Sequence, residues 1–254
     1  MAATKAKSRR SAAPSVDPRE VEAFSALADT WWDPAGPFKP LHKLNPARLD
    51  FILKRLKIHF SLKDTGDAPL KGLKLLDIGC GGGLLCEPMA RLGAEVTGID
   101  AAEKNIGTAA HHAKQSGLKI DYRAVAAEDL AKTRARFDVI LNMEVLEHVA
   151  DVESFLVACR KLLKPKGIMI FSTINRTPKS YIFAIVGAEY VLRWLPVGTH
   201  HWEKFLKPSE MARHCAAAKF ELVDLYGFVY DPLNDAWGVK KDCSVNYFGV
   251  ALPA

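Results

Sequence analysis

The chain has 254 residues, of which 49% are hydrophobic and 25% are charged, a composition typical of a globular protein built as one enlarged domain. Half of its net charge of +6 lies in the first twenty residues, so the remainder is nearly balanced and no nucleic-acid-binding face is indicated. The five cysteines include no CxxC pair, which argues against a disulfide framework or a structural zinc site and favours a reducing compartment.

Residues 1–17 are predicted to form a disordered basic tail. The first sixteen are rich in Ala, Ser, Lys and Arg and contain no acidic residue. A short organellar transit peptide is the alternative, although no apolar periodicity supports a targeting helix. No apolar run in the chain reaches the roughly 20 residues that span a bilayer. We therefore expect a single domain over residues 18–254.

The domain begins with a predicted helical cap over residues 18–60, broken by a loop at residues 31–34. Residues 73–174 then alternate short apolar runs with helical patterns, which predicts right-handed βαβ units and a parallel sheet. The expected strands are residues 73–79, 94–100, 119–125, 137–143 and 167–174. The expected helices are residues 84–92, 102–116 and 152–163, with a turn at residues 165–167.

An insertion at residues 176–205 separates this core from a predicted helix at residues 207–218. Two closing strands are expected at residues 220–226 and 245–251, paired as a hairpin. Together these elements predict an α/β fold with a doubly wound, Rossmann-like, mostly parallel sheet.

The sharpest motif is the run DIGCGGG at residues 77–83, between an expected strand and an expected helix. Glycines there let the backbone pass close to a ligand, and this first turn is where open α/β sheets bind nucleotides. The dehydrogenase pattern G-x-G-x-x-G would need Gly or Ala at position 84, where the chain has Leu84. The motif therefore argues against a nicotinamide-dependent dehydrogenase.

Two acidic positions follow later strands. Asp100 ends the second strand, 21 residues after Gly79, where a carboxylate can accept hydrogen bonds from the ribose hydroxyls of an adenosine. A solvent-exposed aspartate is the alternative. Residues 127–129 (Ala-Glu-Asp) follow the third strand, and they either reach the adenine edge or begin a helix, where acidic residues are favoured.

The glycine run, Asp100 and the sequence MEVLEHV at residues 143–149 resemble class I S-adenosylmethionine-dependent methyltransferases. Three further segments resemble the ubiquinone-biosynthesis O-methyltransferase family in particular: FKPLH at 38–42, LNPAR at 44–48 and GTHHW at 198–202. The resemblance covers about residues 21–251. It implies methyl transfer from S-adenosylmethionine to a ring hydroxyl of polyprenylated phenol and demethylubiquinol intermediates, at two stages of ubiquinone synthesis.

The resemblance also implies cofactor contacts at Arg48, Gly79, Asp100 and Met143. Arg48 can pair with the methionine carboxylate of the cofactor through a charge-assisted contact. Gly79 and Gly81 let that moiety lie against the backbone, with Asp77 just before them. Met143 is expected to pack beside the cofactor, and a plain core methionine is an equally good interpretation.

Glu144, Glu147 and His148 have the spacing i, i+3, i+4, which places them on one face if a helix begins near Glu144. Two carboxylates and an imidazole there suit a divalent cation such as Mg²⁺, and the resemblance implies the same three as metal ligands. The alternative is a metal-free site in which His148 is the general base. His42, His200 and His201 compete for that role.

The insertion contains YIFAIVGAEYVLRWLP at residues 181–196, which is too short and too charged to span a membrane. Its aromatic and basic flanks predict a membrane-facing interfacial helix, and a lid packed on the protein is the alternative. The expected partners are a lipid-soluble polyprenyl phenol, an anionic membrane surface and other enzymes of ubiquinone synthesis, with no nucleic acid. The expected location is the cytoplasmic side of the inner membrane, or the mitochondrial matrix side. A methyltransferase for a soluble phenol and a non-catalytic S-adenosylmethionine-binding scaffold remain as rival functions.

Overall fold

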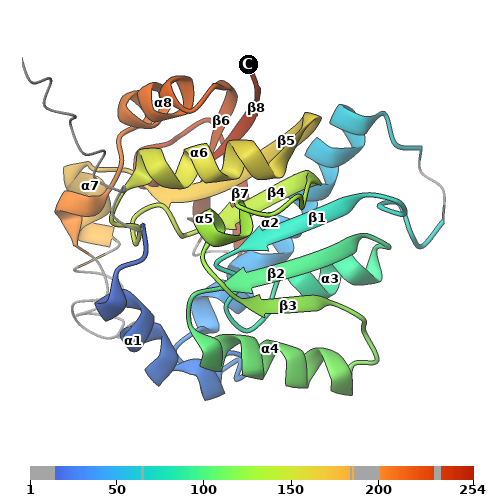
Figure 1. Cartoon of the computed structure of the whole chain (residues 1–254). Helices are drawn as coiled ribbons and strands as arrows, with labels where there is room; N and C mark the ends of the chain where they lie inside the picture. Colours follow the sequence, from blue (N-terminus) through green and yellow to red (C-terminus); the bar gives the residue numbers. More distant parts are fainter. Residues whose placement is uncertain (1–14, 64–65, 184, 186–200, 232–235) are drawn as a thin grey trace, which may run out of the picture.

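A computed structural model describes residues 15–63, 66–183, 185, 201–231 and 236–254. Its centre is an eight-stranded sheet in the order β3-β2-β1-β4-β5-β8-β6-β7 (Figure 1). The first five strands are parallel, and β8 runs antiparallel to both of its neighbours. The strands are β1 (Lys74–Ile78), β2 (Glu95–Asp100), β3 (Asp121–Ala124), β4 (Phe137–Met143), β5 (Leu163–Ile174), β6 (Phe220–Asp231), β7 (Ala236–Lys240) and β8 (Asn246–Pro253). The predicted doubly wound, mostly parallel sheet is thus confirmed.

Helices cover both faces of this sheet. One face packs against α5 (Ala127–Leu130), α6 (Val152–Leu162) and α8 (Pro208–Ala217), which share a hydrophobic cluster with Leu76, Ile140 and Phe171. Figure 1 shows α6 and α8 along the upper side of the sheet. The helix α6 forms because its apolar residues recur along one face and Asp151 caps its first turn by accepting from the Ser154 amide at 3.1 Å.

The other face carries α2 (Lys39–Phe60), α3 (Cys86–Arg91) and α4 (Glu103–Gln115). Phe51, Ile52 and Leu56 of α2 are buried in the same cluster as Leu75 and Ile170 of the sheet. The second half of the predicted cap is therefore a layer of the domain itself. A cap in the strict sense is left to residues 15–38, with α1 (Pro18–Ala26) and the short helix η1 (Ala28–Thr30).

Two features differ from the sequence prediction. The expected turn at residues 165–167 lies inside β5, at the irregularity where the β4–β5 register shifts between Phe137 and Val139. The strand β7 was not predicted; it is a five-residue edge strand that pairs with β6.

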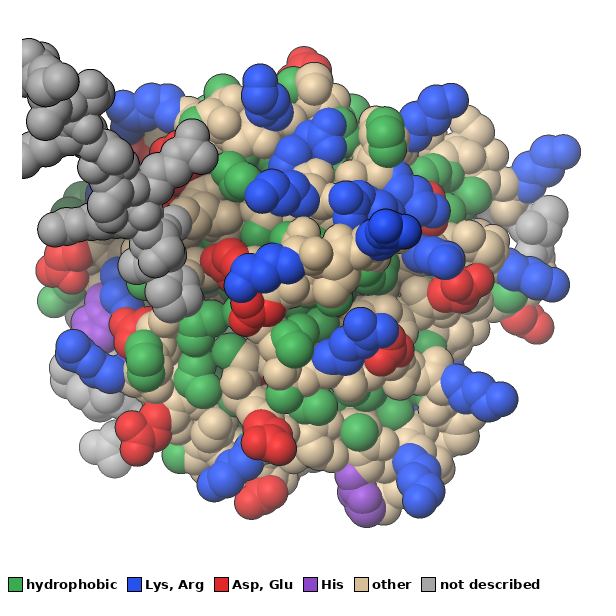
Figure 2. Space-filling view, viewed as in Figure 1, with side chains coloured by type: hydrophobic (Ala, Val, Ile, Leu, Met, Phe, Trp, Pro, Cys, Tyr) green, Lys and Arg blue, Asp and Glu red, His purple; other side chains and the backbone are tan. Residues whose placement is uncertain are grey.

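The charged side chains mix both signs on the face drawn in Figure 2. Lys and Arg are more numerous over α6 and α8, with acidic side chains between them. None of the described helices is long and apolar enough to cross a membrane.

Candidate active site

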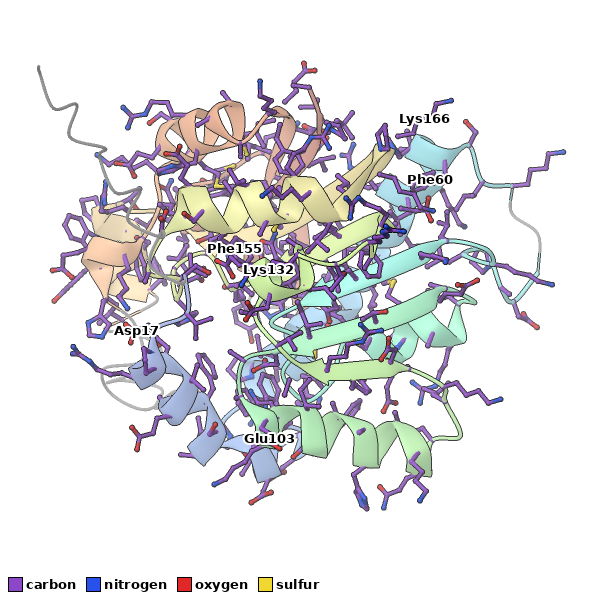
Figure 3. The ribbon with its side chains drawn as sticks, in the orientation of Figure 1. Asp17, Phe60, Glu103, Lys132, Phe155 and Lys166 are labelled. Carbon is purple, nitrogen blue, oxygen red and sulfur yellow. The ribbon has the colours of Figure 1, made fainter. Side chains whose placement is uncertain are left out.

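A pocket opens at the carboxyl ends of β1, β2 and β4, where open α/β sheets bind ligands. In Figure 1 the arrowheads of β1, β2 and β3 point to the side on which α1 lies. Asp17, at the start of α1, and Phe155 of α6 belong to the pocket wall and are labelled in Figure 3. The predicted site residues that line the pocket are Arg48, Asp77, Gly79, Asp100, Met143, Glu144 and His148. Gly81 and Glu147 lie just outside its lining.

The glycine loop is shaped by protein packing as well as by room for a ligand. Gly79 has φ +68°, and a Cβ on it would lie 2.6 Å from Cγ2 of Val145. Gly81 has φ +52°, and its Cβ would lie 2.3 Å from Cζ2 of Trp31. The Trp31 indole lies over Gly81, which gives this glycine a packing role, and its contact with the cofactor stays a prediction.

Asp100 lies in the pocket wall at the end of β2, as predicted. Its Oδ2 accepts from the Gly81 amide at 3.0 Å. Its Oδ1 accepts from the Ala102 amide at 2.8 Å and from Nδ2 of Asn105 at 3.3 Å. Burial raises the pKa of Asp100, and these three hydrogen bonds oppose that shift. Because a carboxylate offers about four lone-pair sites, roughly one remains on Oδ2 for a ribose hydroxyl.

Arg48 reaches the pocket from α2 and is only 4% exposed. Its Nη2 donates to Oε1 of Glu144 at 3.1 Å. Burial lowers the pKa of Arg48, and the Glu144 carboxylate opposes that shift. Its Nε–H is buried without a hydrogen-bond partner among the described residues. A buried donor of this kind suits an anionic group of a ligand.

Asp77 and Met143 complete the cofactor side of the pocket. Asp77 is buried and accepts from Sγ of Cys86 at 3.2 Å. Burial raises the pKa of Asp77 to about 7, against the opposing effects of Cys86 and Arg48. Met143 lines the pocket and also belongs to the hydrophobic cluster on the α2 face of the sheet. It is therefore a core methionine, and its contact with the cofactor stays a prediction.

The segment after β4 is a turn, so the condition under which the three residues would share a face, a helix beginning near Glu144, is not met. Glu144 has φ +57°, a left-handed conformation that a helix does not allow. Ser172 of β5 stabilises this backbone, because the Glu144 amide donates to its carbonyl at 3.2 Å and to its Oγ at 3.0 Å. Glu144, Glu147 and His148 therefore do not share a helix face.

Each member of this trio has its own surroundings. Oε1 of Glu144 accepts from Arg48 and from Oγ of Ser172. Oε2 of Glu147 accepts from Oγ1 of Thr173 at 2.9 Å, whereas its Oε1 is buried without a partner among the described residues. Burial, together with the nearby Glu144 carboxylate, raises the pKa of Glu147 to about 7. Within the described ranges, no three His, Cys, Asp or Glu side chains converge where a metal could be held.

His148 lies between the pocket and the N-terminal segment. Its Nδ1 is 3.1 Å from Oε2 of Glu20 in α1, and Phe24 packs edge-on against its ring. Burial by itself would lower the pKa of His148, but Glu20, Glu147 and Glu144 outweigh it and raise that pKa. Burial by itself would raise the pKa of Glu20, but His148 and Lys204 outweigh it and lower that pKa to about 2.

The other histidines lie elsewhere. Nε2 of His42 contacts the Trp31 carbonyl oxygen at 2.9 Å, and His42 does not line the pocket. His201 is exposed, and His200 lies outside the described residues. His148 is the one histidine that lines the pocket in the part of the chain described here.

The last three residues of the predicted tail, residues 15–17, are part of the folded domain. Residues 1–14 lie outside the described part, but Ser15 is buried, Val16 forms a β-bridge with Val149, and Asp17 caps α1. The Ala150 amide donates to the Ser15 carbonyl oxygen at 2.7 Å. This stretch forms part of the pocket wall, and no local periodicity in the sequence could have signalled it because its partners are more than 100 residues away.

Glu128 also lines the pocket. The sequence left two alternatives for residues 127–129, a contact with the adenine edge or the start of a helix. Glu128 is in the short helix α5, as the second alternative stated. Both of its carboxylate oxygens are buried without a hydrogen-bond partner among the described residues. An amino group of a ligand is the complement such a carboxylate requires.

The insertion is described only at its two ends. Tyr181, Ile182 and Phe183 are 47%, 57% and 59% exposed, whereas Ile185 is buried with Ile174 and Phe205. The guanidinium of Arg176 pairs with the carboxylate of Glu210, and Nζ of Lys179 lies 3.3 Å from Oδ2 of Asp242. The predicted interfacial helix falls largely on residues 186–200, outside the described residues.

The fold and the pocket define the class of protein. A family model described as "Methyltransferase domain" matches residues 76–171. The PH0226 protein of Pyrococcus horikoshii superposes with a TM-score of 0.61 at 17% identity, covering 91% of this chain and 98% of that one. An S-adenosylmethionine-dependent methyltransferase from Clostridium acetobutylicum gives 0.59 at 16% identity, over 81% and 90%. At these identities the structures show the fold alone, which is that of the S-adenosylmethionine-dependent methyltransferases, as predicted.

Sequence relatives give the particular family. A ubiquinone biosynthesis O-methyltransferase of Cereibacter sphaeroides is 55% identical over 238 residues, covering 93% of this chain and 96% of the relative. A protein of the same name from Bartonella bacilliformis is 55% identical over 232 residues, covering 91% and 94%. The chain belongs to the ubiquinone biosynthesis O-methyltransferase family.

Proposed function

We propose that the protein transfers a methyl group from S-adenosylmethionine to a ring hydroxyl of polyprenylated phenol intermediates of ubiquinone synthesis. The observation that carries this proposal is the position of His148, which lines the same pocket as Arg48, Asp100 and Met143. A proton acceptor and the groups suited to the cofactor thus face one cavity. Family membership supports the choice of substrate.

His148 accepts the proton from the hydroxyl as the oxygen attacks the sulfonium methyl carbon. A phenol with a pKa near ~10 is a weak nucleophile until that proton leaves. The carboxylate of Glu20 at Nδ1 favours the tautomer with its proton there, which makes Nε2 the basic nitrogen. Methyl transfer then yields a methyl ether and S-adenosylhomocysteine, and alignment of oxygen, carbon and sulfur supplies most of the rate.

The same test addresses the base and the substrate. His148→Ala is expected to lower kcat for a prenylated catechol by about 10²- to 10⁴-fold while it leaves the Kd for S-adenosylhomocysteine within a few-fold of the parent value. His111→Ala, which alters an exposed histidine of α4, is the matched control and keeps full activity. Unchanged kcat in His148→Ala would remove this residue from the chemistry.

As the alternative to His148 acting as the base, we propose that Glu144, Glu147 and His148 hold a magnesium ion. The two carboxylates suit Mg²⁺, and Oε1 of Glu147, which is without a partner among the described residues, is available to it. Binding requires Glu144 to turn from Arg48 and His148 to turn from Glu20. A bound divalent cation lowers the pKa of a coordinated hydroxyl. If a chelator leaves methyl transfer intact and added Mg²⁺ changes nothing, the three residues act without a metal.

Peripheral membrane binding through residues 176–205 is the remaining part of the proposal, because the substrate is lipid-soluble. Its support is the exposed row Tyr181, Ile182 and Phe183. Apolar burial contributes about 25 cal/mol per Å². Arg176 and Lys179 add less than free cations would, since both are paired with acidic side chains.

Liposome co-sedimentation tests this surface. Ile182→Ser with Phe183→Ser is expected to abolish binding to anionic vesicles, whereas Ile58→Ser, at a more exposed apolar position on α2, keeps it. Ile185 is unsuitable for this test because it is buried in the protein. A chain lacking residues 1–14 separates the contribution of the basic tail. Equal sedimentation of the double variant and the parent would leave the insertion as a lid only.

A further inference from the structure

Three side chains from separate segments form one hydrogen-bonded chain along the pocket wall. Nε1 of Trp31 donates to Oδ1 of Asn105 at 3.0 Å, and Nδ2 of Asn105 donates to Oδ1 of Asp100 at 3.3 Å. The direction is fixed, because an indole only donates and an ionised carboxylate only accepts. All three residues line the pocket.

Asn105 is placed for this role. It lies in the first turn of α4 and is 1% exposed. Burying an amide is costly unless both of its ends are paired. Trp31 donates to its oxygen, and Asp100 accepts from its nitrogen. If the amide were flipped, its NH₂ group would face the indole N–H and its oxygen would face the Asp100 carboxylate, so both contacts would be lost.

Trp31 is in turn held by the cap and by the glycine loop. Its indole stacks on Phe38 with ring centroids 3.7 Å apart and the planes 5° from parallel. Its side chain covers both Gly81 and Gly82, where an added Cβ would lie 2.3 Å from Cζ2 and from Cβ of Trp31, respectively. Trp31 is therefore packed between the glycine loop and Phe38.

The hydrogen bonds on Asp100 are divided unequally between its two oxygens. Oδ1 accepts from both Ala102 and Asn105, and Oδ2 accepts from Gly81 alone. Rotation of the carboxylate would break the Asn105 contact. The arrangement leaves Oδ2 as the oxygen with room for a further donor.

We propose that Asn105 and Trp31 are positioning residues that fix the Asp100 carboxylate and present Oδ2 to a ribose hydroxyl of the cofactor. This inference rests on the proposed role of Asp100 as the ribose acceptor, and the variants below separate the two.

Calorimetric titration with S-adenosylhomocysteine and with its 2′-deoxy and 3′-deoxy analogues tests the proposal. Trp31→Phe removes the N–H donor together with the part of the indole that lies over Gly81, so we expect about five- to tenfold weaker binding of S-adenosylhomocysteine, and the ribose preference separates the lost donor from the lost packing. Asn105→Asp keeps the Trp31 contact and sets a carboxylate against Asp100, so we expect a loss of more than about tenfold. In both variants the preference for the ribose form over the deoxy analogues shrinks towards one. Trp237→Phe, which alters an indole outside the pocket, leaves affinity and preference unchanged.

A merely structural role would lower the melting temperature of both variants and leave the ribose preference at the parent value, and that result would overturn the proposal. Asp100→Ala is titrated alongside them. If it loses affinity and preference while Trp31→Phe and Asn105→Asp retain both, Asp100 binds ribose without these residues. If Asp100→Ala also retains both, the ribose assignment fails and the positioning proposal fails with it.

Discussion

Arg48→Met locates the amino-acid end of the cofactor in the pocket. The side chain is buried, and methionine keeps an apolar stem in place of the Arg48 methylene groups while it removes the charge and the donors of the guanidinium. Glu144 is not left unpaired, because its Oε1 still accepts from Oγ of Ser172 at 2.7 Å and its side chain is 27% exposed. We therefore expect the folded state to survive, with a melting temperature lowered by a few degrees.

The loss of affinity follows from the donor that Arg48 offers. Its buried Nε–H is without a partner in the described part of the chain, and a charge-assisted hydrogen bond to a carboxylate contributes about 1.5–3 kcal/mol, or roughly 10- to 150-fold in Kd. Calorimetry should show this loss for S-adenosylhomocysteine, which carries the carboxylate, and almost none for adenosine, which lacks it. Equal losses for both ligands, or none for either, would refute the assignment of Arg48 to the methionine carboxylate.

Three further predictions concern the rest of the pocket. Asp100→Ala is expected to weaken binding of S-adenosylhomocysteine by about 10- to 150-fold, since roughly one ribose hydrogen bond to a carboxylate is available on Oδ2. An unchanged Kd in a folded variant removes Asp100 from the site, and Asp50→Ala, at an exposed position of α2, is the control. Because the pKa of Asp77 is raised to about 7, the folded chain holds a proton there that the unfolded chain has lost, so this residue makes stability fall as the pH rises from about 4 to 7. Denaturant titrations should show that slope flattened in Asp77→Asn, and an identical slope in both proteins contradicts the raised pKa. Gly82→Ala places a Cβ 2.3 Å from that of Trp31 and should cost about 1–3 kcal/mol by overpacking, measured as a lower melting temperature and faster proteolysis within residues 15–38; unaltered proteolysis would show that the cap does not rest on this loop.

The parallel core of the sheet was predictable because its strands are short apolar runs bounded by turn residues. Asp100 was predictable for the same reason, since the end of β2 fixes where its side chain must lie. The edge strand β7 was missed because it has only five residues, one of them Gly238, and lacks a clear alternation.

The turn at Glu144 could not be predicted from spacing. A separation of i, i+3, i+4 fits a helix face, but the tertiary contacts with Ser172 hold a left-handed backbone instead. The roles of Trp31 and Asn105 were equally hidden. They depend on three segments that meet only after folding, and neither residue belongs to a local motif.

Methyl transfer to a ring oxygen can be measured by analysis of the reaction product. The full chain is incubated with S-adenosylmethionine carrying a ¹³C-labelled methyl group and with a prenylated catechol, and the product is examined by NMR. We expect one labelled methyl ether on the ring for each S-adenosylhomocysteine released. Label on a ring carbon, or tight cofactor binding with no label transferred to the catechol, would contradict that expectation.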